Sequence, residues 1–177
     1  MFTATKVKAI KGYKLWYDSI SNFEKFFDNH NIVAPSNIVG ANDGLFTTCP
    51  IPKNTKLGKY TGTIYNPSEK SVCDESYVLQ INANVAIDAL TNLTCIFRYI
   101  NDPINSKFIN CRFNKNGDII STKFIFPGEE LFIGYGKDYW YDKNNYVRLK
   151  NKVPIRKDIW CQKECCKSWR KDLYNLI

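Results

Sequence analysis

Two stretches of the sequence decide the fold: Arg98-Tyr99-Ile100-Asn101 and Gly128-Glu129-Glu130-Leu131-Phe132-Ile133-Gly134-Tyr135-Gly136. Tyr135 follows Asn101 by 34 positions, so both stretches belong to one region of the chain. Either stretch alone is a weak signal, because Gly-Glu-Glu-Leu is common and Arg-Tyr-x-Asn can be ordinary strand sequence. Their meaning depends on the rest of the chain and on the motifs that precede them.

The length and composition indicate a single domain with extensions. The chain has 177 residues, of which 44% are hydrophobic and 15% aromatic. That is enough to bury one good core but short for two. No run approaches the roughly 18 apolar residues of a membrane span, and the start Met1–Lys6 lacks the pattern of a signal peptide. We therefore expect a soluble intracellular protein with no membrane partner.

The formal net charge of +8 is concentrated near the C-terminal end. Residues 142–177 carry ten basic and four acidic side chains, whereas residues 37–141 carry ten of each. A basic segment of this kind could contact nucleic acid or an acidic protein. It could equally be a solvated face that favours solubility, because charge alone does not name the partner.

The hydrophobic pattern indicates short strands between two helical ends. In residues 1–36 we predict one helix, with Ser21 as its N-cap and Glu24 completing a capping box. A second short helix is predicted in Trp160–Ile177, where apolar residues recur every three to four positions: Trp169, Leu173 and Leu176. Turn residues separate the strands predicted between these helices: Gly44–Phe46, Lys59–Tyr65, Tyr77–Ile81, Val85–Asp88, Phe108–Phe113, Ile119–Ile120 and Leu131–Ile133.

These stretches, together with the motifs before them, resemble a SET domain, the domain of protein lysine methyltransferases. The segment from Gly128 to Gly136, with Lys137–Trp140 after it, also resembles the related PR domains. The other motifs stand in the family's order, with compatible spacing, between residues 38 and 141: Asn42-Asp43-Gly44-Leu45-Phe46, Ile51-Pro52-Lys53-Asn54-Thr55, Tyr60-Thr61-Gly62-Thr63-Ile64, Asp74-Glu75-Ser76-Tyr77 and Ala86-Ile87-Asp88-Ala89.

The resemblance implies a mainly β fold with short helices. The expected form is the SET-domain β-clip architecture of several small sheets with a knot-like C-terminal crossing. The resemblance also divides the chain into three parts: an N-terminal helical extension in residues 1–36, a SET domain in residues 37–141, and a basic post-SET-like segment in residues 142–177.

The activity that the resemblance implies is methyl transfer from S-adenosylmethionine to a lysine of a histone tail or another basic protein. The reaction is an in-line attack by a neutral amine, so catalysis is largely positioning and exclusion of water. Free lysine has a pKa of about 10.4, and an apolar channel would favour its neutral form. A histone substrate would imply a protein of the nucleus or chromatin.

The alternative is a noncatalytic SET/PR-like interaction module. Such a module would bind chromatin or nucleic acid through the basic tail in residues 142–177. Binding of S-adenosylmethionine separates the two function classes, because only the enzyme requires it.

The site residues follow from matching the family's motifs to this sequence. Tyr135 matches the catalytic tyrosine, and Asn101 matches the asparagine whose amide binds the methionine end of the donor. Each has a structural alternative, Tyr135 as a buried tyrosine and Asn101 as a link across the crossing. The other donor-binding candidates are the main chain of Asn42, Asp43, Gly44, Leu45 and Phe46, together with Tyr77, Arg98, Asp102 and Trp140.

Several of these candidates also have a second interpretation. Arg98 is expected to help hold the crossing together, and Tyr77 could be part of strand packing. Trp140 or Tyr139 could stack on adenine, because aromatic faces suit flat heterocycles. Core packing is the alternative for either ring.

The lysine channel is expected to involve Phe113, Ile133 and Tyr135. Ile133 stands two residues before the tyrosine, where an aromatic residue in the family often limits the number of methyl groups added. Phe113 has no hydroxyl to anchor a blocking water. The resemblance therefore implies that methylation proceeds beyond the monomethyl product.

The chain departs from the family pattern at two places. After Asn101 it has Asp102-Pro103-Ile104 where the family shows His-Ser-Cys, so the histidine that meets adenine and a cysteine of the zinc site are both absent. At Asn42 an asparagine replaces a turn glycine, and asparagine tolerates left-handed backbone better than most residues.

The seven cysteines lack the dense, even spacing of a small secreted scaffold, so we expect reduced thiols. Cys161, Cys165 and Cys166 lie where a post-SET zinc site would be, but their spacing is not Cys-x-Cys. A rearranged thiolate set would need Cys111 or Cys95. Zinc is not expected, and the sole histidine, His30, is predicted to lie at the surface.

Overall fold

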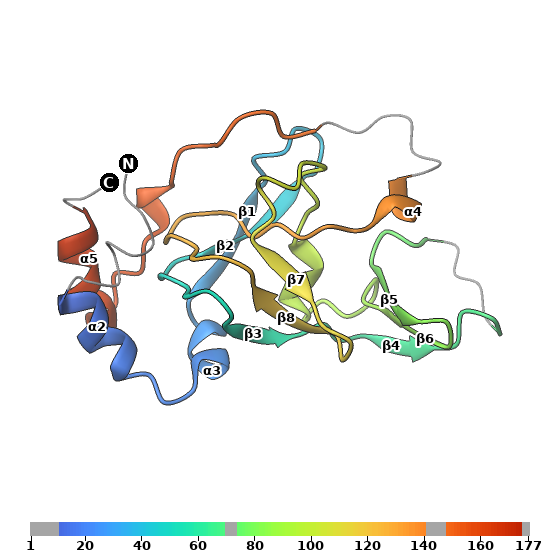
Figure 1. Cartoon of the computed structure of the whole chain (residues 1–177), viewed down its shortest axis with the longest axis horizontal. Helices are drawn as coiled ribbons and strands as arrows, with labels where there is room; N and C mark the ends of the chain where they lie inside the picture. Colours follow the sequence, from blue (N-terminus) through green and yellow to red (C-terminus); the bar gives the residue numbers. More distant parts are fainter. Residues whose placement is uncertain (1–10, 70–73, 141–147, 175–177) are drawn as a thin grey trace.

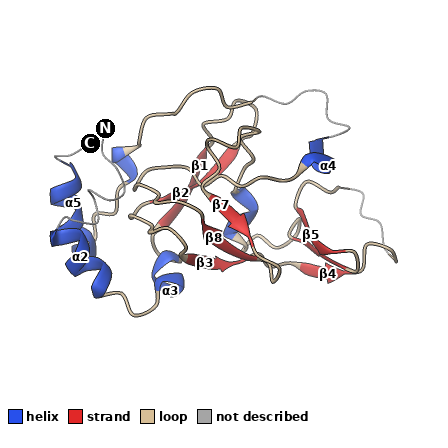
Figure 2. Cartoon of the chain, in the orientation of Figure 1, coloured by secondary structure: helices blue, strands red, loops and turns tan. Residues whose placement is uncertain are grey.

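The computed structural model describes residues 11–69, 74–140 and 148–174 (Figure 1). In these residues eight short strands form three small antiparallel sheets, flanked by short helices (Figure 2). The strands are β1 Asn31–Pro35, β2 Asp43–Thr47, β3 Lys56–Lys59, β4 Thr63–Tyr65, β5 Val78–Asn82, β6 Val85–Asp88, β7 Cys111–Phe113 and β8 Asp118–Ser121. The α-helices are α2 Lys11–Asp18, α3 Phe23–Phe27, α4 Lys137–Trp140 and α5 Lys167–Tyr174, and the 3-10 helices are η1 Ile96–Tyr99, η2 Lys157–Ile159 and η3 Glu164–Cys166.

The sheets have the strand orders β1-β2, β3-β8-β7 and β4-β6-β5. In the third sheet the central residue Ile87 faces Ile64 on one side and Leu79 on the other. The mainly β prediction with several small sheets is therefore confirmed. No helix in the described part of the chain combines the length and apolarity needed to cross a bilayer.

The predicted strand Leu131–Ile133 forms no sheet strand, and its residues pair instead with different segments. The Leu131 N–H donates to the Leu45 carbonyl at 2.7 Å, and the Ile133 N–H donates to the Asn101 carbonyl at 3.0 Å. The Phe132 carbonyl accepts from the Asn110 N–H at 3.1 Å. One segment thus runs between β2, the Asn101 region and the start of β7, which is the knot-like crossing that the resemblance implied.

The N-terminal prediction was wrong in detail. The N-cap of α3 is Asn22 rather than Ser21, and its side-chain oxygen accepts from the Lys25 N–H at 3.0 Å. Both residue types cap helices well, so sequence alone did not fix the position. The prediction also missed α2 and β1.

The C-terminal helix is shorter than predicted, because α5 begins at Lys167 rather than Trp160. Trp169 and Leu173 are buried, and Leu176 lies outside the described residues. Trp169 packs against Trp16 of α2, with ring centroids 6.1 Å apart. The basic segment is therefore built into the fold where it is described.

The buried side chains form two large clusters. The main core lies between the small sheets and includes the fully buried Leu45, Leu57, Ile119 and Leu131. A second cluster lies at the end of the molecule where α2 and α5 lie side by side (Figure 1). We call this second cluster the flank module, and its buried residues include Tyr13, Trp16, Cys49, Phe124, Trp160, Cys161, Cys166, Trp169 and Leu173.

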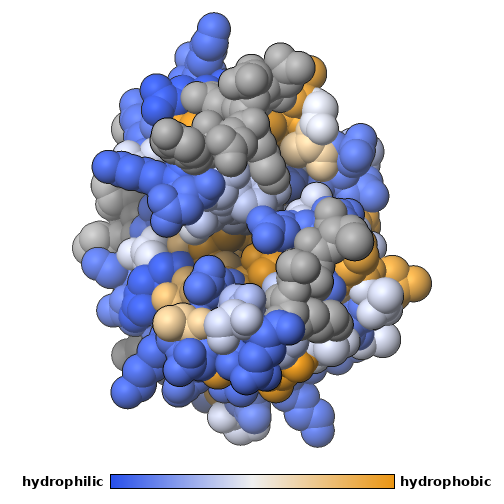
Figure 3. Space-filling model, turned by 90° about the vertical axis from the view of Figure 1, so that its right-hand side faces the viewer, coloured by the Kyte–Doolittle hydropathy of each residue, from blue (hydrophilic) through white to orange (hydrophobic). Residues whose placement is uncertain are grey.

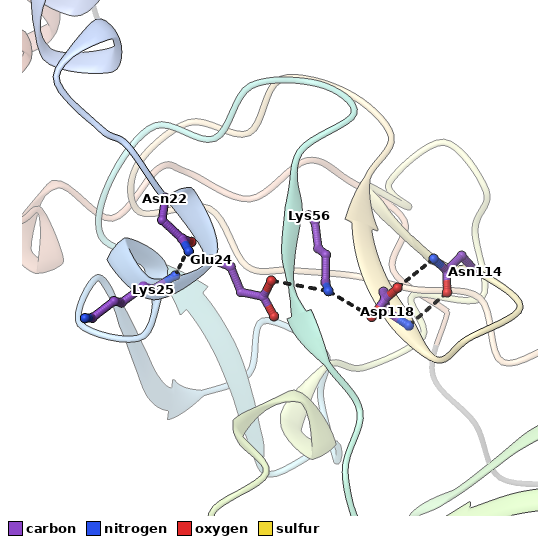
Figure 4. A network of polar contacts seen from close by, with 6 residues as sticks. All are labelled: Asn22, Glu24, Lys25, Lys56, Asn114 and Asp118. Carbon is purple, nitrogen blue, oxygen red and sulfur yellow. Dashed lines mark hydrogen bonds and ion pairs between the residues drawn. The ribbon is translucent and has the colours of Figure 1, made fainter.

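A polar network joins α3 to the sheet of β3 and β8 (Figure 4). The Lys56 ammonium lies 3.3 Å from the Glu24 carboxylate and 3.2 Å from that of Asp118. The Asn114 amide donates to Asp118 at 2.9 Å, and this bond, reinforced by Lys56, lowers the pKa of Asp118. The Lys56 side chain is substantially exposed, so its ion pairs contribute little to the stability of the fold.

A buried carboxylate fixes the start of the crossing. Glu130 is 2% exposed and accepts hydrogen bonds from the Ser36 hydroxyl at 2.6 Å and from the Asn37 N–H at 2.8 Å. The Asn101 amide also donates to it, at 3.4 Å. Burial raises the pKa of Glu130, while these donors oppose the shift. A methyl group at Gly44 would overlap the carboxylate, which explains the glycine in β2.

This packing predicts that Gly44→Ala lowers the free energy of unfolding by about 1–3 kcal/mol, the usual cost of overpacking a core. Urea denaturation followed by circular dichroism would measure the change. In a Glu130→Ala background the overlapping group is gone, so Gly44→Ala should cost much less and the two changes should be strongly coupled. Equal costs in the two backgrounds would contradict this account of the glycine.

Candidate functional site

A groove opens at the end of the molecule formed by α4 and the sheet of β4, β5 and β6. Its volume is about 690 Å³. Figure 3 shows this end, where apolar surface lies in a depression ringed by hydrophilic side chains. Glu75 and Asp138 are the only charged residues among its described lining. Its aromatic wall consists of Tyr60, Tyr65, Tyr77, Phe113, Tyr135 and Tyr139.

A second hollow, of about 420 Å³, lies beside the groove. Gly134 lines both hollows, so they approach each other at the residue before Tyr135. The other residues that line the second hollow are Asp102, Ile104, Asn105, Ser106, Ile109, Gly136, Lys137 and Trp140. The crossing therefore separates a tyrosine-rich groove from a smaller hollow with one aromatic wall.

Tyr135 is held at this boundary from several directions. Its hydroxyl donates to the Ile100 carbonyl at 2.7 Å, and its N–H donates to the Asp102 carboxylate at 2.8 Å. Its ring is stacked on that of Trp140, with centroids 6.1 Å apart, and contacts Tyr139 edge-on at 4.7 Å. Burial raises the pKa of Tyr135, so its hydroxyl stays protonated at neutral pH.

Asp102 is an internal anchor. Its carboxylate is buried and accepts from the Tyr135 N–H, from the Trp140 indole N–H at 2.9 Å and from the Ile104 N–H at 2.7 Å. Ile104, at the family's cysteine position, has φ of 52°. A β-branched residue in left-handed backbone is strained by about 1–3 kcal/mol, and the Asp102 bond helps hold it there.

The Asn101 side chain joins the crossing to the 42–46 segment. Its amide nitrogen donates to the Asp43 carbonyl at 2.9 Å as well as to Glu130. Asn42 has φ of 55°, the left-handed conformation that asparagine tolerates.

The structure does not bring the 42–46 segment into either hollow, because none of its residues lines them. The side chains of Leu45 and Phe46 are fully buried. Only the exposed positions Asn42 and Asp43 leave this segment accessible to a ligand.

Arg98 and Tyr77 form a stacked pair. The Arg98 guanidinium carbon lies 4.0 Å from the centroid of the Tyr77 ring. The Tyr60 hydroxyl donates to the Tyr77 carbonyl at 2.7 Å. Tyr77 lines the groove, whereas Arg98 and Asn101 line neither hollow.

The three residues predicted for the channel all line the groove: Phe113, Ile133 and Tyr135. Tyr60, which the sequence analysis did not name as a site residue, also lines the groove. Its ring contacts Phe113 edge-on, with centroids 5.7 Å apart. The available signal was its place in the Tyr60–Ile64 motif.

The prediction that His30 lies at the surface was wrong. Its side chain is 4% exposed, and its ring lies against Cys165 and Cys166. Cys95 and Cys111, considered as partners for the late cysteines, belong to the main core, whereas Cys161 and Cys166 belong to the flank module. Sequence reasoning had no signal for this grouping, because His30 and Cys165 are far apart along the chain.

Comparison with protein families matches residues 42–136 to the SET domain model. The chain belongs to the SET-domain family. The match spans the 42–46 segment, most of the groove lining and the crossing up to Gly136. No curated protein matches the sequence.

Two solved structures are similar to this chain at 22% identity, over 61% of its length. One is ctPRC2 in complex with H3K27me3 and H3K27M, with a TM-score of 0.49. The other is an active polycomb repressive complex 2 in the stimulated state, with a TM-score of 0.48. The aligned part spans 14% and 15% of those chains, respectively.

The role of Asp102 as an anchor predicts that Asp102→Ala destabilises the fold. Three N–H donors would lose a charged acceptor, so the free energy of unfolding should fall by at least about 1.5 kcal/mol. Asp138→Ala is the matched control, because that carboxylate is exposed on α4 and its removal should change stability by less than about 0.5 kcal/mol. Equal urea midpoints for the two variants would exclude the anchor.

Proposed function

We propose that this SET domain is an S-adenosylmethionine-dependent protein-lysine N-methyltransferase that acts on a histone tail or another basic protein. The observation that carries the proposal is the position of Tyr135 at the boundary between the groove and the second hollow. Methyl transfer needs two ligands that approach from different sides and meet in line. The proposed catalytic tyrosine lies where two such ligands would meet.

The groove suits a basic peptide. Glu75 and Asp138, its only charged described lining residues, are both acidic, so they would attract a lysine-rich segment. β5 is an edge strand of its sheet and lines the groove with Val78, Leu79 and Gln80. An extended peptide could therefore add to β5 as a further strand, through main-chain hydrogen bonds.

The second hollow suits the donor. Its volume lies within the usual range for small-molecule sites, and its lining includes the Trp140 ring, which also packs on Tyr135 and would contact adenine. The Asn101 amide uses its nitrogen within the fold, and its oxygen would accept from the ammonium of the methionine end. Asn101, Asn42 and Asp43 line neither hollow, so the methionine end would have to extend beyond the second hollow to reach the Asn101 amide and the exposed main chain of Asn42 and Asp43. The bound donor would supply the sulfonium methyl.

The residues of the groove would prepare the amine for attack. Tyr60, Phe113 and Ile133 form an apolar wall that disfavours a charged ammonium and excludes water. The Tyr135 hydroxyl donates to the Ile100 carbonyl, so its oxygen lone pairs face other groups and can make weak CH···O contacts with the transferring methyl. No acid–base pair is needed once the amine is neutral.

The second candidate is a noncatalytic module that binds chromatin or nucleic acid through residues 142–177. The use of Asp102 within the fold, in place of a histidine that meets adenine, favours it. Described lysines of this tail are exposed, including Lys150, Lys163 and Lys171. A histone substrate or a chromatin ligand would place the protein in the nucleus.

Two measurements separate these candidates. An enzyme should gain about 2.7 kcal/mol of stability at S-adenosylmethionine concentrations one hundred times Kd, whereas a module that does not bind the donor should gain nothing. Purified histones and total cell lysate should then acquire methyl-lysine, read by mass spectrometry. Donor binding without any methylated product would contradict the enzyme.

Asn101→Ala is expected to weaken S-adenosylmethionine binding by about 1.5–3 kcal/mol, the value of a hydrogen bond to a charged group. Isothermal titration calorimetry would measure the affinity. Because Asn101 also binds the Asp43 carbonyl, a denaturation curve must show that the variant is folded at the temperature used. Asn116→Ala, in an exposed turn, should leave the affinity unchanged. Unchanged affinity in folded Asn101→Ala would remove Asn101 from the donor site.

Tyr135→Phe is expected to lower the turnover rate at least tenfold, which is about 1.4 kcal/mol of barrier. The phenylalanine keeps the stacking on Trp140 but loses the hydroxyl. Tyr17→Phe, an exposed tyrosine of α2, is the matched control and should retain the wild-type rate. Full activity in Tyr135→Phe would rule out the proposed catalytic role.

The wild-type enzyme is expected to proceed beyond monomethyl-lysine, because Phe113 offers no hydroxyl to hold a blocking water. Phe113→Tyr should shift the product toward monomethyl-lysine, since its ring lines the groove with Tyr135. The mass of a peptide product under excess donor distinguishes these outcomes, with Phe108→Tyr as a control outside the groove. A wild-type product that stops at one methyl group would refute the expectation.

A further inference from the structure

Residues from the two flanks of the SET domain meet beside β2. His30 follows α3 and precedes β1, whereas Cys165 and Cys166 form the end of η3. The main chain holds these segments together through Thr48, whose N–H donates to the His30 carbonyl at 3.0 Å and whose carbonyl accepts from the Cys161 N–H at 2.9 Å. The grouping is therefore part of the hydrogen-bonded fold.

Two distances within this group match those between ligands of a tetrahedral zinc site. The Cys165 Sγ atom lies 3.7 Å from the His30 Nε2 atom and 3.8 Å from the Cys166 Sγ atom. All three ligand atoms lie within 4.8 Å of one another. Zinc bonds of about 2.3 Å to sulfur and about 2.0–2.1 Å to nitrogen place tetrahedral sulfur ligands about 3.8 Å apart, and sulfur and nitrogen about 3.5 Å apart.

The imidazole of His30 is oriented as a ligand. Its Nδ1 atom lies 2.7 Å from the Phe26 carbonyl, to which it must donate, so the lone pair is on Nε2, the atom near Cys165. Its ring is stacked on Phe26 with centroids 3.7 Å apart. Metal-binding histidines commonly donate their other ring N–H to a carbonyl in this way.

Cys161 is the candidate for the fourth ligand. It is not among the three residues whose ligand atoms lie within 4.8 Å of one another, so its side chain would have to turn toward the ion. It is buried in the flank module, and its thiol lies beside that of Cys166. Cys49 shares the module, but its sulfur contacts the Thr47 hydroxyl at 3.7 Å. Cys165 is exposed, so a metal ion can enter from solvent.

We propose that His30, Cys161, Cys165 and Cys166 bind one structural Zn²⁺ ion. Three thiolates and one imidazole in tetrahedral arrangement are a ligand set that zinc prefers. The proposal replaces the expectation of no zinc. It differs from the post-SET site considered from the sequence, because it uses His30 and not the Ile104 position, Cys95 or Cys111. The ion would fasten the segment before β1 to the segment before α5.

The test is metal analysis of the purified full-length chain, prepared under reducing conditions with zinc present and then dialysed. About one equivalent of zinc per chain is expected. The metal-free protein, titrated with Co²⁺, should develop the visible bands of a tetrahedral site and the charge-transfer absorption of thiolate ligands. Chelation of the metal should lower the melting temperature, because the ion links two flanks of the fold.

Variants give the matched comparison. Cys165→Ala, at an exposed position, should fold and bind zinc at least roughly tenfold more weakly, as should His30→Ala. Cys111→Ala removes a buried thiol of the main core and should bind zinc as the wild type does. A chelator should lower the melting temperature of Cys165→Ala less than it lowers that of the wild type.

Three results would overturn the proposal. The first is wild-type protein that retains less than about a tenth of an equivalent of zinc and gives no thiolate absorption with Co²⁺. The second is Cys165→Ala and His30→Ala proteins that bind zinc with wild-type affinity. The third is a disulfide between Cys165 and Cys166 in protein kept under reducing conditions. None of these results depends on methyltransferase activity.

Discussion

The carboxylate of Glu130 is the constraint on which the crossing depends. It draws donors from Ser36 and Asn37 after β1 and from Asn101, and it lies against Gly44 of β2. A carboxyl group buried this deeply is costly unless its partners are all in place, so these segments must assemble together. Asn101, the asparagine proposed to bind the donor, is thus held by its hydrogen bond to Glu130, which is first of all a structural contact.

Motif order along the sequence predicted the small sheets and the crossing, because these depend on glycine turns and on a few polar residues at set positions. Contacts between segments that are far apart in the sequence determined the features that the sequence analysis missed. β1, which ends in Pro35, has little strand signal and is defined by its pairing with β2. His30 looked like a surface residue, because the segment that buries it lies 135 positions away. Phe113 and Ile133, which line the groove, were proposed for the channel through the family pattern rather than through any local one.

From the sequence, the departure from the family pattern after Asn101 looked like the loss of a histidine that meets adenine and of a cysteine of the zinc site. In the fold, Asp102 gains three hydrogen bonds and fastens Trp140 and Tyr135 to the same carboxylate. The wall of the second hollow is therefore held by side chains of this chain where relatives use a histidine.

The flank module and the groove lie at opposite ends of the molecule (Figure 1). The two segments that bracket the SET domain are joined to each other behind it, and the groove faces away from that junction. A protein attached through the α2–α5 end would therefore not compete with a peptide in the groove. If the groove holds the proposed peptide, the surface at the α2–α5 end lies apart from the surface that would select the substrate, and the two surfaces can change independently.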